Sequence, residues 1–352
     1  MASFRNILAG ISITIAASCM AVPAHAILLR LPTANDALFR NKPEDFFMYV
    51  DRTFEGVKSK PWEGGQYGFT RTLVRTQAGP VATKFHEGID IKPLKRDATG
   101  APLDMVHPVA GGRVVHVSDN PRDSSYGRYV VIEHTLPDGP LYSLYAHLAS
   151  TNCKPGDVVG TGNTIGKLGY SGVGINKERA HVHLELCLLL NRNFQKWYDG
   201  RKLGTPNKHG IFNGLNLSGF NPVDALMICK DGTPFNLSQY ISGLPPQYTV
   251  RVPNAGTPDM VKRYPFLLKQ GSNNPASWEI ALTDSGVPVS FTPSAEPCAE
   301  PIVISAVPHP FSQLYRTVNR VKGSSKAPIL TPSGKSYIKL LTMSAPENSS
   351  DN

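Results

Sequence analysis

The sequence predicts a mainly β protein with two regions, a larger antiparallel β domain followed by a smaller α+β domain. The 31 Gly and 30 Pro residues favour turns and short strands over long helices. Short β-branched or alternating runs, separated by turn residues, fill the stretch from 85 to 190. The length of 352 residues suits two domains of roughly 100 to 200 residues each.

The first 26 residues have the three parts of a secretory signal. Arg5 supplies the positive charge, an apolar run covers 7–17, and Ala24-His25-Ala26 offers small residues for cleavage. We therefore expect export through the secretory pathway, to the periplasm or the outside of the cell. Lipid attachment at Cys19 is the less favoured alternative. No later apolar run reaches about 20 residues, so we expect no integral membrane segment in the mature chain.

The chain is basic, with a formal charge of +9 that becomes +8 once the signal and its Arg5 are removed. This charge suits cell wall, acidic lipid or nucleic acid, and it also serves simple solubility, so it selects no partner. We expect no nucleic-acid partner. Four cysteines remain after the signal, and they permit two disulfides in three connectivities. Their spacing lacks the short pairs of structural zinc motifs; they are Cys153, Cys187, Cys229 and Cys298.

The predicted organisation assigns each stretch of the chain to one unit. In chain order these units are a signal peptide at 1–26, an N-terminal extension or pro-segment at 27–65, the larger β domain at 66–230, an accessory domain of unknown role at 231–343 and a disordered tail at 344–352. Within the larger domain the predicted strands are 112–117, 128–133, 141–146, 164–168 and 180–190. Elsewhere we predict helical segments at 43–50, 221–226 and 311–321, and hairpins at 277–292 and 329–341.

Two histidine-bearing segments carry the candidate chemistry, HEGID at 86–90 and HVH at 181–183. In an extended strand, residues two or four apart point to one face, so His86 and Asp90 should project together, as should His181 and His183. Catalytic zinc takes three nitrogen or oxygen ligands and keeps one position for water, and two His with one Asp supply such a set. Each motif alone also arises by chance, as a buried or surface histidine pair.

The surrounding segments are more specific than either motif. From 68 to 226 the chain resembles the lysostaphin-like zinc metalloendopeptidases, peptidoglycan hydrolases with a small all-β domain called the duplicated hybrid motif fold. The segments that carry the resemblance, in order, are YGFTR (67–71), HEGIDI (86–91), PVAGGRV (108–114), YGRYVVIEH (126–134), LYAHL (144–148), KPGDVVGTG (154–162), IGKLGYSG (165–172) and HVHLE (181–185).

The resemblance implies one zinc ion per chain, bound by His86, Asp90 and His183, with catalytic roles for His147 and His181. It also implies a secreted zinc metalloendopeptidase that hydrolyses peptide bonds in the cross-links or stem peptides of peptidoglycan. Two alternatives stay open. One is a non-catalytic module that binds the wall or activates a hydrolase, and the other is a metallopeptidase that acts on Gly-rich proteins.

Two loops depart from the family pattern, and several polar residues have a structural interpretation. The insertion at 93–106 and the longer stretch at 172–180 are expected to flank the cleft and to affect substrate preference. We interpret His107 and His116 as packing or surface residues. Glu185 either orients a ligand through a hydrogen bond or has a structural role.

Overall fold

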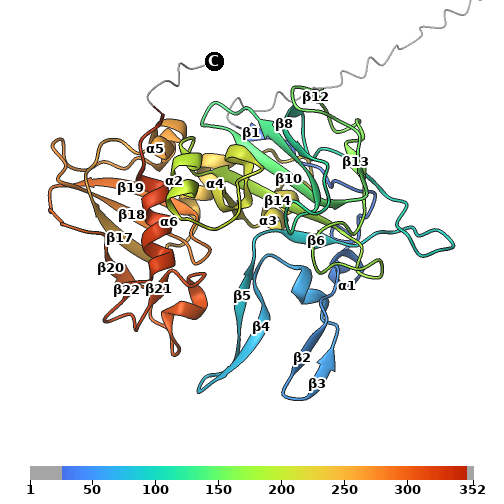
Figure 1. Ribbon diagram of the computed structural model, residues 1–352, viewed down its shortest axis with the longest axis horizontal. Coiled ribbons are helices and arrows are strands. Elements are labelled where there is room, and N and C mark those ends of the chain that lie inside the picture. The colour runs from blue at the N-terminus through green and yellow to red at the C-terminus, as the bar shows by residue number, and fades with distance from the viewer. Residues whose placement is uncertain (1–25, 347–352) are drawn as a thin grey trace, which may run out of the picture.

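The computed structural model describes residues 26–346. The predicted signal peptide, apart from Ala26, and residues 347–352 of the predicted tail lie outside the described residues. The described chain is mainly antiparallel β, as predicted. In Figure 1 the larger sheet system, coloured cyan to green, stands beside a C-terminal sheet with helices, coloured orange to red.

The larger sheet has seven strands in the order β12-β8-β9-β10-β14-β15, with β6 pairing to the first part of β14. Its strands are β6 (Ile89–Ile91), β8 (Gly112–Ser118), β9 (Arg128–His134), β10 (Leu141–Leu148), β12 (Val158–Val159), β14 (Val182–Leu189) and β15 (Leu217–Phe220). Both β10 and β14 are buried along their whole length because apolar side chains cover both faces of the sheet. Four predicted strands are thereby confirmed. The fifth, at 164–168, is reduced to β13 (Gly166–Lys167), which joins β7 (Met105–Val106) and β11 (Ser150–Thr151).

The N-terminal segment packs against the larger sheet. It contains α1 (Pro43–Phe46), the hairpin of β2 (Arg52–Phe54) and β3 (Val57–Ser59), and a 3-10 turn, η1 (Trp62–Gly65). Phe46 and Phe47 are buried, Phe47 bridges to Ile91, and Met48 N–H donates to the Asp90 carbonyl. The helix predicted over 43–50 therefore ends early, because its second half lies extended beside β6. A second hairpin, β4 (Gly68–Thr76) and β5 (Gly79–His86), follows.

A four-stranded antiparallel sheet, in the order β19-β18-β17-β20, forms the C-terminal region. Its strands are β17 (Tyr248–Pro253), β18 (Ser277–Leu282), β19 (Pro288–Ser294) and β20 (Ile302–Ala306), and the helices around it are α4 (Leu237–Gly243), α5 (Asp259–Arg263) and α6 (Pro332–Thr342). The shorter elements are α2 (Phe194–Gly200), α3 (Pro222–Cys229), β16 (Phe235–Asn236), β21 (Val321–Lys322), β22 (Ile329–Leu330) and the 3-10 turns η2 (Gly210–Phe212), η3 (Gly214–Asn216), η4 (Pro265–Leu267) and η5 (Gln313–Arg316).

Two predictions in this region are wrong and two are confirmed. The hairpin at 277–292 and the short helix near 221–226 are present as β18–β19 and α3. The second predicted hairpin is instead helix α6, because Thr331 caps its N-terminus and Pro332 suits the first helical turn. The helix predicted at 311–321 is a single 3-10 turn, which cannot continue because Val318 and Asn319 adopt left-handed backbone conformations.

The two sheets share one apolar core, so the predicted boundary near residue 230 does not separate two independent cores. Across it, Tyr264 Oη accepts from the Leu189 N–H at 3.0 Å, and Asn191 donates to the carbonyls of Leu340 and Met343. Asp259 is fully buried and pairs with Arg192 and Arg263. At the other end of the chain, β1 (Ala26–Ile27) pairs with β16.

The four cysteines of the described chain are free, so neither of the two permitted disulfides is formed. Cys187 is a buried thiol in β14 and donates to Glu185 Oε2 at 3.2 Å. Between residues 26 and 346, no helix combines the length and the apolar character needed to cross a membrane.

Candidate metal centre

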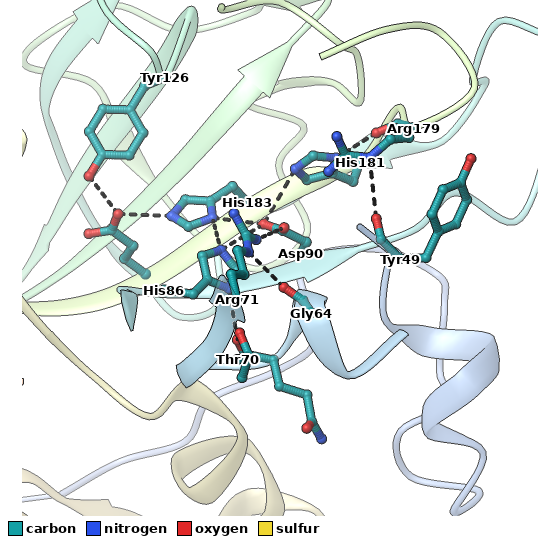
Figure 2. A network of polar contacts seen from close by, with 12 residues as sticks. Tyr49, Gly64, Thr70, Arg71, His86, Asp90, Tyr126, Arg179, His181 and His183 are labelled. Carbon is teal, nitrogen blue, oxygen red and sulfur yellow. Dashed lines mark hydrogen bonds and ion pairs between the residues drawn. The ribbon is translucent and has the colours of Figure 1, made fainter. Parts of the chain in front are cut away.

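His86, Asp90 and His183 bring three possible ligand atoms to one point (Figure 2). His86 Nε2 lies 3.1 Å from His183 Nδ1, and Asp90 Oδ1 lies 3.0 Å and 2.9 Å from these two nitrogens. Ligand atoms of a tetrahedral zinc with bonds near 2.0–2.2 Å are about 3.3–3.5 Å apart. Outward shifts of a few tenths of an ångström would therefore let these residues hold zinc.

The backbone explains why these three side chains meet. Asp90 in β6 and His183 in β14 are direct cross-strand partners. His86 and Asp90 project together as predicted, but not from one strand, because β5 ends at His86 and a turn separates it from β6. Gly88 in that turn has no room for a side chain, since a Cβ would lie 2.3 Å from the Leu184 carbonyl oxygen and 3.0 Å from the His183 ring. The glycine thus permits the close approach of the two segments.

Hydrogen bonds on the far side of each ring select the nitrogen that faces the centre. His86 Nδ1 lies 2.8 Å from the Gln66 carbonyl, an acceptor, so Nδ1 carries the proton and Nε2 keeps its lone pair. His183 Nε2 lies 2.9 Å from Glu185 Oε1, which leaves Nδ1 toward Asp90. Of the two roles considered for Glu185, this contact matches the one that orients a ligand. The donor set and its tautomers therefore fit a zinc ion.

Arg71 approaches the opposite oxygen of the Asp90 carboxylate. Its Nη2 donates to Asp90 Oδ2 at 2.6 Å and its Nε donates to the Gly64 carbonyl at 2.8 Å (Figure 2). The β4–β5 register shifts between Phe69 and Arg71, and Thr72 has a left-handed backbone. This bulge turns the guanidinium toward the centre. Arg71 had no predicted role, although it ends the YGFTR segment.

His147 and His181 stand beside the three candidate ligands. The rings of His147 and His181 have centroids 4.8 Å apart, and His147 lies 5.8 Å from His183. His147 Nδ1 faces the Ser171 carbonyl at 2.9 Å, and His181 Nδ1 faces the Arg179 carbonyl at 2.6 Å. Both Nε2 atoms are thereby left for the centre, and His181 Nε2 is 3.3 Å from Asp90 Oδ1.

His147 reaches this place through an unusual backbone. Its φ is +62°, and the register between β10 and β9 shifts between Tyr145 and Leu148. A left-handed non-glycine residue costs of order 1–3 kcal/mol and persists where the surroundings enforce it, often at functional sites. The bulge interrupts the strand alternation, and the His147 ring then packs beside those of His181 and His183.

Burial and charge shift the titration of these groups. Burial alone would raise the pKa of the Asp90 carboxyl, but the charges of His86 and His181 outweigh it and hold that pKa well below its usual range. Burial alone would lower the pKa of His183, yet its hydrogen bonds to Asp90 and Glu185 raise the pKa to about 10. Two carboxylates that attract a proton so strongly also attract a metal cation. Burial, with the charges of His181 and His183, holds the pKa of His147 well below its usual range, which favours the neutral ring.

The centre lies in a groove of about 870 Å³. His86, Asp90, His147, His181 and His183 all line it. The predicted flanking loop at 172–180 contributes Val173, Gly174, Ile175 and Arg179 to the wall. The insertion at 93–106 does not line the groove and instead supports that loop, because Arg96 donates to the carbonyls of Lys177 and Glu178.

Residues 84–194 match the sequence profile of peptidase family M23. The chain carries an M23 peptidase domain. This confirms the lysostaphin-like resemblance for the segment that holds all five candidate residues. No curated protein matches the chain in sequence.

Solved structures similar to this chain include three of different kinds. A zinc-containing peptidase from Vibrio cholerae is 24% identical over 40% of this chain and 36% of its own, with a TM-score of 0.25. The catalytic domain of lysostaphin from Staphylococcus simulans is 19% identical over 47% of this chain and 96% of its own, with a TM-score of 0.28. A complex of SpoIIIAH and SpoIIQ gives 21% identity over 45% of this chain and 90% of its own, with a TM-score of 0.27. The chain thus spans about a third of the Vibrio cholerae protein.

Proposed function

We propose that this protein is an exported zinc endopeptidase that hydrolyses peptide bonds in the cross-links or stem peptides of peptidoglycan. The observation that carries the proposal is the convergence of His86 Nε2, Asp90 Oδ1 and His183 Nδ1 within an M23 domain, in the lining of an open groove. The predicted signal at 1–26 supports export, and the basic charge suits an anionic wall polymer.

Zinc, when bound, would lower the pKa of a water molecule toward about 7 and polarise the scissile carbonyl. The chain would supply the remaining chemistry. His147 and His181 each present Nε2 to the centre, where one ring can accept the proton of the attacking water. The other ring, when protonated at Nε2, can donate to the developing oxyanion. Arg71 neutralises the second oxygen of Asp90 and holds that carboxylate in place.

A comparison of zinc-loaded with zinc-free protein tests the proposal. One sample of mature protein is loaded with zinc, and a second is stripped of metal by a chelator. Each is incubated with wall material of known cross-link type, and the products are analysed by mass spectrometry. We expect new peptide termini from the loaded protein only, with recovery when zinc is added back. Stoichiometric zinc without any cleavage, on walls of several cross-link types, would instead favour the non-catalytic wall-binding or hydrolase-activating role.

The third candidate function is a metallopeptidase with the same chemistry that acts on Gly-rich proteins. A Gly-rich protein in the same assay separates it from the first, because a wall enzyme should cleave wall peptides at far lower concentration. All three candidate ligands and both candidate catalytic histidines are present in the chain and line the groove. This favours either peptidase over a non-catalytic module.

A further inference from the structure

The groove around the candidate centre has an excess of positive charge. The charged side chains that line it are the cations Arg71, Lys84, Arg122, Arg179 and Lys208 and the carboxylates Glu87, Asp90 and Asp123. Arg71 is paired with Asp90, at 2.6 Å. Lys208 is likewise paired with Asp123, at 2.6 Å. Three cations thus remain in the lining against one carboxylate, Glu87, so the groove attracts an anionic ligand.

Of the three remaining cations, Arg179 lies beside the candidate catalytic residues. Its carbonyl oxygen is 2.6 Å from His181 Nδ1, and the opposite nitrogen of that ring, Nε2, is 3.3 Å from Asp90 Oδ1. One imidazole ring therefore separates the Arg179 backbone from a candidate zinc ligand (Figure 2). Residues of an extended peptide are roughly 3.3 Å apart. A peptide cut at the centre can therefore place a residue about one or two positions from the cleaved bond next to Arg179.

The loop at 172–180 holds Arg179 in a defined position. Asn176 Oδ1 accepts from the Arg179 N–H at 3.0 Å, and Arg179 Nε donates to the Tyr49 carbonyl at 3.3 Å. Arg96 supports the same loop through two backbone carbonyls. The two terminal nitrogens of Arg179, Nη1 and Nη2, have no hydrogen-bond or ion-pair partner among residues 26–346. The half-buried side chain thus brings two positioned donors to the groove.

The chemistry of these donors selects a carboxylate. A guanidinium is always charged in a protein, and its nitrogens form a planar fork. That fork matches the two oxygens of a carboxylate, and the paired hydrogen bonds are strengthened by the opposite charges. A Gly-rich peptide without acidic residues offers no such partner near the cleaved bond.

We propose that Arg179 determines substrate specificity by binding a free carboxylate of the substrate, about one or two residues from the bond that is cut. The inference rests on the proposed function and names the class of peptide that the groove accepts. The carboxylate belongs either to an acidic side chain or to a free C-terminus, since both have the same chemistry. Lys84 and Arg122 are exposed in the same groove and add long-range attraction for the anionic substrate.

The test combines changes in the substrate with one change in the full mature chain. The starting substrate is a soluble cross-linked peptide that wild-type protein cuts, identified from the digestion of wall material. In a second form, the acidic side chain near the cleaved bond is replaced by its primary amide, and in a third form the free C-terminus is amidated. We expect one of these two forms to lose about 10- to 100-fold in wild-type kcat/KM, mainly through KM, which identifies the source of the carboxylate.

Arg179→Gln should lower kcat/KM on the free acid by the same factor, with zinc content unchanged. The variant should also no longer distinguish the free acid from its amide, because a direct contact makes the two changes non-additive. A purely structural role for Arg179 would leave that distinction in place. Arg113→Gln is the matched control, since Arg113 is exposed, donates to one backbone carbonyl and lies outside the groove. It should keep the wild-type preference.

Each other outcome has a definite meaning. Wild-type protein that cuts no wall peptide removes the proposed function. Equal wild-type cleavage of all three forms, or an Arg179→Gln variant that still prefers the free acid, overturns the role of Arg179 alone. A preference that disappears in Lys84→Gln or Arg122→Gln instead also overturns it. Should Arg179→Gln unfold, Arg179→Lys replaces it. This variant keeps the charge without the fork, so its preference for the free acid should be reduced, and an undiminished preference refutes the contact.

Discussion

Glu185 offers a sharp test of how the centre is held. Its carboxylate is 1% exposed and faces three donors, since Oε1 lies 2.9 Å from His183 Nε2 and 2.6 Å from the Tyr126 hydroxyl, and Oε2 lies 3.2 Å from Cys187 Sγ. Glu185→Gln keeps the shape and removes the charge. Its amide oxygen can still accept from His183 and Tyr126, while its NH2 group faces Cys187 Sγ, a weak acceptor. The hydrogen bond that fixes the His183 tautomer is then no longer charge-assisted, and it is weaker.

The expected magnitude follows from this geometry. Loss of an outer partner of a metal-binding histidine typically weakens metal affinity 10- to 100-fold, or about 1.4–2.7 kcal/mol. We expect Glu185→Gln to fall in this range, because the contact is short, buried and charge-assisted. Competition with a zinc chelator of known affinity measures the dissociation constant directly.

A matched control exists on the same sheet. Glu133 Oε2 accepts from the Tyr142 hydroxyl at 2.8 Å, but neither residue lines the groove. Glu133→Gln should therefore leave zinc affinity unchanged. Equal zinc dissociation constants for Glu185→Gln and wild type, within a factor of two and with both proteins folded, would refute the reasoning that Glu185 orients His183.

Three further predictions concern the centre and the junction between the two sheets. His183→Ala should lose stoichiometric zinc, and metal analysis that still finds one zinc per chain would remove His183 from the ligand set. His147→Ala and His181→Ala should keep zinc and lose about 10²- to 10⁴-fold in turnover, measured on wall peptides; near-normal turnover in either refutes its catalytic role. Asp259→Ala leaves the buried Arg263 guanidinium unpaired, so denaturant unfolding should show a loss of about 3–5 kcal/mol, and a loss under 1 kcal/mol contradicts the pairing.

The sequence predicted the strands around the centre well because their signals are local. Alternating or β-branched runs bounded by turns mark β8, β9, β10 and β14 within a few residues. The five candidate residues were named from motif spacing and resemblance, and the structure brings them together around one groove. Their roles stay predictions, since zinc binding and turnover are still to be measured.

Other features depend on contacts between residues that are far apart in the sequence, and no local sequence pattern predicts them. The PSGK stretch at 332–335 is typical of a turn, but tertiary packing makes it the first turn of α6. The loop at 207–213 is polar, and no local pattern predicts that its His209 ring meets His116, 93 positions earlier in the chain. The sequence also did not predict that the two sheets share one apolar core, because the apolar content of a strand does not reveal which core it joins.

The anchoring of the chain after β14 has a consequence for the time at which the fold around the candidate centre can be completed. The strand that carries His183 ends at Leu189. Two residues later, the Asn191 side chain donates to the carbonyl of Leu340, 149 positions further along the chain. At 5–20 residues per second, synthesis of that stretch takes roughly 8–30 s. During this interval the Asn191 side chain lacks its acceptors, the carbonyls of Leu340 and Met343. Pairing over such separations also slows folding. The contact that holds the chain just after the His183 strand can therefore form only once α6 has been made.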